Sequence, residues 1–217
     1  MKWGYGFFMG LGFLGLGLMF SCANAPTNSE AENVDSSALT ASAKAEYRSR
    51  GMTITKASFQ ALSGALQSQM KAGGPSAAVD FCNVHASSLV DSLMQEHGVS
   101  IRRTSMRYRN PANAPTALER AYLSRFDSIF ETGQEPRGEV VYVEGEVHYF
   151  QPIFLSDACL KCHGSVRDIG METQALLEAR YPEDRATGFK PGDLRGMWSL
   201  AFEEAGPSTR EENPKNP

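Results

Sequence analysis

Cysteine is scarce in this sequence, with four residues in 217, which is too few for a scaffold held together by disulfides. An excess of positive charge is also missing, because 25 aspartates and glutamates outnumber 21 lysines and arginines. Proteins that bind nucleic acid usually present a basic face, so we expect no nucleic-acid partner. The composition, with 41% hydrophobic and 21% charged residues, excludes collagen-like, coiled-coil and fully disordered chains and suits one globular domain.

The N-terminal segment contains no charged residue over positions 3–20, after a short positive start. A basic start, an apolar stretch and small residues at the exit are typical of an export signal. We predict that residues 1–22 are a lipoprotein signal peptide and that Cys22 carries the lipid. The alternatives are a soluble periplasmic protein cleaved after Ala25 and an uncleaved membrane anchor. All three place the domain outside the cytoplasm, and the first ties it to a bacterial membrane facing the periplasm.

The folded domain is expected to lie between two segments that cannot build a core. Residues 23–52 are rich in Ala, Ser, Asn, Thr and Glu and contain few large apolar side chains, which predicts a disordered tether. Residues 206–217 are rich in proline and charge, which predicts a disordered tail. The interval 53–205 is therefore assigned to the domain.

The pattern of apolar residues in this interval predicts helices first and strands later. Phe59, Leu62 and Leu66 recur at steps of three and four, which gives the first helix one apolar face. The expected helices span residues 54–71 and 76–97 and the segment that follows Thr116. Thr116 with Glu119 three positions later is a capping-box pattern, which predicts the start of this third helix. Runs rich in Val, Tyr and Phe on either side of a Gly-containing turn predict a hairpin of strands at residues 139–143 and 147–153. Residues 99–103 and 197–202 are further candidate strands. Helices followed by an antiparallel sheet are the pattern of an α+β fold.

The strongest chemical signal is the C-x-x-C-H motif of Cys159, Cys162 and His163, the attachment sequence for c-type haem. Two thiols one helical turn apart can each add to a vinyl group at the porphyrin edge. His163 then lies below the iron and offers an imidazole nitrogen as proximal ligand. We therefore predict one covalently bound haem c. A zinc site would need a second close pair of ligands, and a redox disulfide would favour a thioredoxin-like context, so both alternatives are weaker.

The ligand on the other side of the iron stays open at this point. Cys82 is the cysteine that remains once Cys22 is assigned to lipid and the motif pair to porphyrin. It falls on the apolar face of the helix over 76–97, so it is either a buried small hydrophobe or a distal thiolate that faces His163. His85 lies three residues further along and is the rival ligand. Methionine also ligates haem iron, which makes Met94, Met106, Met171 and Met197 formal candidates.

Four arginines gather in one short stretch of an otherwise acidic chain, namely Arg102, Arg103, Arg107 and Arg109. Haem carries two propionates, and arginine pairs bidentately with carboxylates. We expect at least one of Arg102 and Arg103 to meet a propionate. The alternative is a solvated basic face.

Several motifs in order make residues 53–203 resemble a family of extracytoplasmic c-type haem domains with a PAS-like fold. The matching stretches are residues 77–82, 101–105, 109–115, 152–153, 159–164, 181–186 and 188–196. The resemblance implies a central antiparallel sheet with flanking helices, one haem, and axial ligation by the motif histidine and a cysteine. The positions that match these ligands are His163 and Cys82, and His85 leaves a ligand swap open.

The expected function is that of a membrane-tethered periplasmic haem protein that senses redox state or a small ligand. The alternative is an electron-transfer cytochrome that keeps both axial ligands in each oxidation state. Peroxidase chemistry needs an open distal side with an acid–base residue, for which only His85 could serve, so we expect no enzymatic activity. The expected partners are the membrane, through the lipid, and a redox or signalling protein.

Overall fold

The computed structural model describes residues 39–202. The expectations for the signal peptide, for lipidation of Cys22 and for the C-terminal tail lie outside the described residues. Four antiparallel strands form one sheet in the order β1-β4-β3-β2. The strands are β1 (Val99–Thr104), β2 (Glu139–Val143), β3 (Glu146–Phe154) and β4 (Leu194–Phe202).

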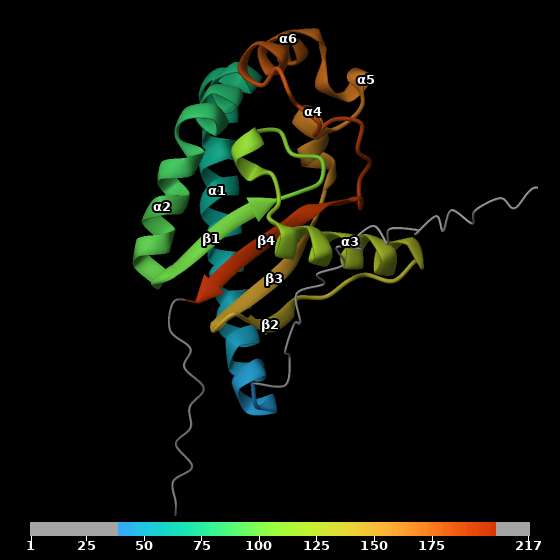
Figure 1. The fold of residues 1–217 in the computed structure, drawn as a ribbon. Coiled ribbons are helices and arrows are strands. Elements are labelled where there is room, and N and C mark those ends of the chain that lie inside the picture. Colours follow the sequence, from blue (N-terminus) through green and yellow to red (C-terminus); the bar gives the residue numbers. More distant parts are fainter. Residues whose placement is uncertain (1–38, 203–217) are drawn as a thin grey trace, which may run out of the picture. The chain divides into compact units, whose positions relative to one another are not determined.

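Helices cover both faces of this sheet (Figure 1). The helices α1 (Ala41–Val84) and α2 (Ala86–His97) lie on one face, and α3 (Ala117–Glu131) lies on the other. After β3 come the 3-10 turn η3 (Asp157–Cys159) and the helices α4 (Leu160–His163), α5 (Val166–Ile169) and α6 (Met171–Arg180). A second 3-10 turn, η2 (Pro111–Asn113), lies between β1 and α3. The α+β class, with an antiparallel sheet and flanking helices, is confirmed. Within residues 39–202, no helix combines the length and the apolar character that crossing a membrane requires.

The alternation of side chains along the strands divides the core into two layers. Tyr149 of β3 and Trp198 of β4 belong to the layer that packs against α1 and α2. Phe150 and Met197, one position removed on each strand, pack with Phe126 of α3 on the opposite face. Strand residues can therefore reach a site on the α1 side only if they share the direction of Tyr149 and Trp198.

Helix α1 begins earlier than the composition predicts. Residues 41–52, assigned above to a disordered tether, form its first turns. Thr40 caps the helix, because its hydroxyl oxygen accepts a hydrogen bond from the Ala43 N–H at 3.1 Å. Leu39 is buried in the core layer on this side. The predicted tether boundary at residue 52 is therefore wrong, and the ordered domain includes residue 39.

A backbone kink divides α1 into two parts. Gly73 and Gly74 have non-helical backbone angles, and the φ of 66° at Gly74 is a left-handed value that favours glycine. Pro75 follows and suits the first turn of the second part, where a missing N–H costs nothing. The predicted break between two helices is confirmed at this position.

The second predicted helix, over residues 76–97, is itself interrupted. It breaks at His85, where α1 ends and α2 begins. Residues 75–84 consequently form a short helical segment with a kink on one side and a break on the other. This segment carries Cys82.

The face that α1 turns toward the sheet consists mainly of small side chains. The buried positions of its first part are Gly51, Ile54, Thr55, Ser58 and Leu62. Phe59, which apolar periodicity assigns to the buried face, is 54% exposed, so that expectation is wrong. A Cβ atom at Gly51 would lie 2.2 Å from the Tyr149 ring, which shows how closely the helix approaches β3.

Replacing Gly51 by alanine is expected to lower the free energy of unfolding by about 1–3 kcal/mol, the usual cost of overpacking a core. Tyr149 is fully buried and its hydroxyl donates to Gln151 Oε1 at 2.5 Å, so the ring is not free to move aside. Thermal unfolding measures the effect. Gly64→Ala on the same helix is the matched control, since a Cβ there meets no atom within 4 Å and alanine favours helix. Equal destabilisation by both substitutions would contradict the packing argument.

Candidate functional site

The C-x-x-C-H motif lies in the connection of residues 155–193, which joins β3 to β4, its neighbour in the sheet. The connection is closed at its base. There the Leu155 N–H donates to the Asp193 carbonyl at 3.1 Å, and the Gly192 N–H donates to the Leu155 carbonyl at 2.7 Å. Helices α4, α5 and α6 follow one another beyond the end of the sheet (Figure 1). The motif is thereby presented outside the two core layers.

The two motif cysteines present free thiols one helical turn apart. Cys159 ends η3, Cys162 lies within α4, and neither forms a disulfide. The Cys159 Sγ atom lies 3.4 Å from the Ser156 hydroxyl oxygen. Among residues 39–202, no three side chains of His, Cys, Asp or Glu come together as a metal site. Both thiols are free to bind a cofactor.

One hydrogen bond orients the His163 imidazole. Its Nδ1 lies 2.7 Å from the Ala186 carbonyl oxygen. Because a carbonyl only accepts, Nδ1 carries the proton and Nε2 keeps a free lone pair. Burial, together with the charges of Arg109 and Arg195, holds the pKa of His163 well below its usual value. The imidazole is therefore neutral and suited to bind a metal through Nε2.

The backbone of residues 186–189 supports the motif from the other end of the connection. The Phe189 N–H donates to the His163 carbonyl at 3.0 Å, and the Gly188 N–H donates to the Gly164 carbonyl at 2.6 Å. The Phe189 ring also meets the imidazole edge-on, with ring centroids 6.5 Å apart. The histidine is thus held by backbone on one side and by an aromatic ring on another.

The helical segment 75–84 packs against the helices that follow the motif. Val79 belongs to a buried cluster with residues of α5 and α6. Next to it, Asp80 accepts an ion-pair contact from Arg180 Nη2 at 2.8 Å. The fold therefore brings Cys82 to the same end of the molecule as the motif.

Cys82 is exposed, so the expectation that it lies on a buried helix face is wrong. The alternative of a buried small hydrophobe is excluded by the same observation. Neighbouring protein groups still desolvate the thiol and raise its pKa, while the charges of Arg103 and Arg109 act in the opposite direction. Burial also raises the pKa of Cys162, which Arg109 lowers and Cys82 raises further. The two thiols are thus within electrostatic reach of each other.

Two adjacent arginines on β1 point to opposite faces of the sheet. Arg102 faces α3, where its Nε donates to Glu119 Oε1 at 3.1 Å. Arg103 faces the α1 side, and its guanidinium carbon lies 5.9 Å from the centre of the Trp198 ring. Burial lowers the pKa of Arg103, and the Cys82 thiol opposes that shift. Because side-chain direction alternates along a strand, Arg102 lies on the α3 face and Arg103 on the α1 face. The propionate role predicted for at least one of them stays a prediction, and Arg103 is the one that lies near Cys82.

Two further arginines, to which the sequence assigned no individual role, lie near the motif. Arg109 Nε donates to Asp184 Oδ2 at 2.9 Å, and its Nη2 donates to the Cys162 carbonyl at 2.5 Å. Arg195 Nη1 donates to the Arg107 carbonyl at 2.9 Å, and burial lowers the pKa of Arg195 to about 10. Both residues stand in stretches that carry the family resemblance, which was the available signal.

The rival ligands occupy different surroundings. His85 is exposed at the junction of α1 and α2. Met197 is fully buried on the α3 face, and Met94 packs against the core on the α1 face. Met106 and Met171 are exposed. Met94 and Met197 are therefore core residues, and His85 is the rival that lies near Cys82 in the chain.

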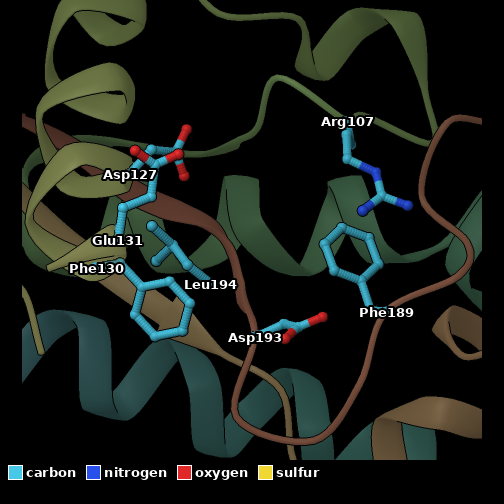
Figure 2. A pocket seen from close by; sticks show the side chains of 7 residues that line it. All are labelled: Arg107, Asp127, Phe130, Glu131, Phe189, Asp193 and Leu194. Carbon is cyan, nitrogen blue, oxygen red and sulfur yellow. The ribbon is translucent and has the colours of Figure 1, made fainter. Parts of the chain in front are cut away.

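A hollow of about 230 Å³ opens beside the site, between α3 and the end of the connection (Figure 2). Its lining residues are Arg107, Asp127, Phe130, Glu131, Phe189, Asp193 and Leu194. The Arg107 guanidinium carbon lies 3.8 Å from the centre of the Phe189 ring. Figure 2 shows Asp127 and Glu131 across the hollow from this pair. The hollow shares Phe189 with the support of the motif but includes no motif residue.

Comparison with known proteins gives one family and one solved structure. The model of the Tll0287-like family, described as Tll0287, matches residues 25–202. The crystal structure of the cyanobacterial heme-protein Tll0287 is 28% identical, with a TM-score of 0.55, over 74% of this chain and 96% of that chain. No curated protein matches the chain. The family match spans the described fold from the start of α1 to the end of β4.

Proposed function

Because the chain belongs to the Tll0287-like family, we propose that it is a c-type haem protein, tethered to a bacterial membrane and facing the periplasm. The related crystal structure is that of a heme-protein. The observation that carries the proposal is the His163 imidazole, neutral and held at Nδ1, which directly follows two free thiols. The export signal expected over residues 1–22 supports the compartment, since haem attachment to such motifs takes place outside the cytoplasm.

The donor set of the site fits one haem c. Cys159 and Cys162 would form thioethers with its two vinyl groups, and His163 would offer Nε2 to the iron as proximal ligand. Cys82, an exposed thiol on a neighbouring helical segment, would be the distal ligand. Once bound, the haem supplies an iron that changes its oxidation state. The chain holds it, orients the imidazole and sets the charge around it.

The arginines suit the two propionates of such a haem. The pKa of His163 is lowered by burial and by the charges of Arg109, Arg195 and Arg103. These three guanidinium groups are therefore gathered around the imidazole. Of these three arginines, Arg109 forms an ion pair with Asp184 in the described part of the chain. The surplus positive charge would stabilise carboxylates, and Arg103 takes the role expected for one of Arg102 and Arg103.

We favour sensing of redox state or of a small ligand over electron transfer. Cys82 lies on the segment 75–84, which is separated from the rest of α1 by a kink and from α2 by a break. We infer that a ligand on such a short segment can leave the iron more readily than one within a long continuous helix. The role of Cys82 would then be that of a releasable iron ligand, and a shift of the segment 75–84 that carries it would be a signal that a redox or signalling partner could read.

Optical spectra of the full chain, made in a host that matures c-type cytochromes, test this function. We expect a Soret band in both oxidation states. We also expect CO to shift the spectrum of the reduced protein, because Cys82 leaves the iron. An electron carrier keeps both ligands, so a reduced spectrum that CO does not change would favour electron transfer. A colourless protein would contradict the haem proposal itself.

A further inference from the structure

The Asp184 carboxylate is hydrogen-bonded to the same residue, Ala186, whose carbonyl orients His163. Asp184 Oδ1 accepts the Ala186 N–H at 2.7 Å. The carbonyl of the same Ala186 accepts the His163 Nδ1–H at 2.7 Å. The N–H and the carbonyl belong to the two peptide units that flank the Ala186 Cα, so the backbone of this one residue links the Asp184 carboxylate to the imidazole.

Arg109 holds this arrangement from the other side. Its Nε donates to Asp184 Oδ2 at 2.9 Å, while its Nη2 donates to the Cys162 carbonyl at 2.5 Å and reaches the Ala186 carbonyl at 3.4 Å. One guanidinium thus joins the motif helix to the turn that carries the acceptor for His163. The Arg109 and Asp184 side chains are 13% and 11% exposed, so little water is present to replace a lost contact.

We propose that Arg109 and Asp184 form a positioning pair, which fixes the His163 imidazole through the Ala186 carbonyl and so tunes the iron. The proposal rests on the haem function proposed above. A hydrogen bond to Nδ1 sets the rotation of the ring and increases the electron density at Nε2, which strengthens its donation to a metal. Loosening the pair should weaken that donation, stabilise ferric iron less and raise the reduction potential.

The chain contains a matched control on the opposite face of the sheet. Arg102 pairs with Glu119 at 3.1 Å, and the Glu119 side chain is 4% exposed, so this is also a buried carboxylate held by one arginine. Glu119 additionally belongs to the capping box of α3, where it accepts the Thr116 N–H at 2.9 Å. Breaking the Arg102–Glu119 pair should cost stability without altering the imidazole.

The experiment compares Asp184→Asn, Arg109→Lys and Glu119→Gln with the wild-type full chain after haem maturation. Asparagine removes the charge and turns an amide donor toward either Arg109 or Ala186. Lysine keeps the charge of Arg109 but cannot bridge a carboxylate and a carbonyl with the same geometry. The readouts are the ferric EPR g-values, the Soret maximum and the reduction potential, with thermal unfolding measured alongside.

We expect Asp184→Asn and Arg109→Lys to shift the EPR signal and raise the potential, while Glu119→Gln lowers only the melting temperature. Spectra and potentials unchanged in both site variants would overturn the proposal. A shift in Asp184→Asn alone would overturn it as well, because charge and not positioning would then explain the effect. So would an equal shift in Glu119→Gln. If Asp184→Asn fails to fold, the milder Arg109→Lys decides. A wild-type chain without haem would instead refute the proposed function.

Discussion

Replacing both Cys159 and Cys162 by alanine is expected to remove all haem that survives denaturation. The two thioethers would be the covalent bonds between the chain and the porphyrin, and coordination by His163 does not survive in denaturing detergent. Haem staining of a denaturing gel measures the effect. The wild-type band should stain, the double variant should not, and each single variant, with one thioether left, should stain less than the wild type.

The control for this experiment is Cys82→Ala, which removes a thiol near the motif without touching the predicted attachment. It should keep the stain of the wild type. The double variant should also retain its circular dichroism, because the two core layers on the sheet contain no residue of 155–193 among the described part of the chain. Full staining of the double variant would contradict covalent attachment.

The second large effect is expected from Cys82→Ala in the ferric protein. A thiolate donates more charge to ferric iron than a neutral ligand does, so its loss should move the Soret band and the EPR g-values and raise the reduction potential. The covalently attached haem should remain bound. Absorption and EPR spectra of the oxidised protein, with a potentiometric titration, measure these changes.

His85→Ala is the matched variant for that experiment, since His85 is exposed three residues further along the chain. It should leave the spectra and the potential of the ferric protein unaltered. If His85→Ala altered the spectra and the potential while Cys82→Ala left them unchanged, the histidine would be identified as the distal ligand.

Local patterns predicted the strands and the α3 cap well. Runs rich in Val, Tyr and Phe predicted the hairpin of β2 and β3, and the candidate strands at 99–103 and 197–202 correspond to β1 and β4, all to within three residues at each end. The capping box at Thr116 and Glu119 is present, with hydrogen bonds in both directions. These features depend on neighbours in the chain, and the sequence contains all the information that they require.

The start of α1 and its buried face could not be predicted in this way. Amphipathic periodicity counts large apolar residues, and it selected Phe59, which is exposed. The contact between α1 and the sheet is made by small residues such as Gly51 and Ser58, because small side chains let the helix approach closely. Small residues are invisible to a hydrophobicity pattern, and for this reason residues 41–52 resemble a tether.

The site arginines needed knowledge of long-range structure. Arg102 and Arg103 are equivalent by composition, and only the pairing of Arg103 with Trp198 in the sheet register shows which of them faces the α1 side. Arg109 and Asp184 are 75 residues apart in the chain, and no periodicity relates them. The thiols and the imidazole, by contrast, were found because their chemistry requires a fixed spacing.

The closed base of the connection between β3 and β4 has a further consequence. Leu155 and Asp193 are hydrogen-bonded neighbours at the mouth of the connection, at the ends of two adjacent antiparallel strands. A turn of a few residues could join the same two strand ends, so the connection of residues 155–193, which carries the motif, is in effect one enlarged hairpin loop. The sequence, length and chemistry of this loop can therefore change while the sheet and the helices that pack on it keep their arrangement.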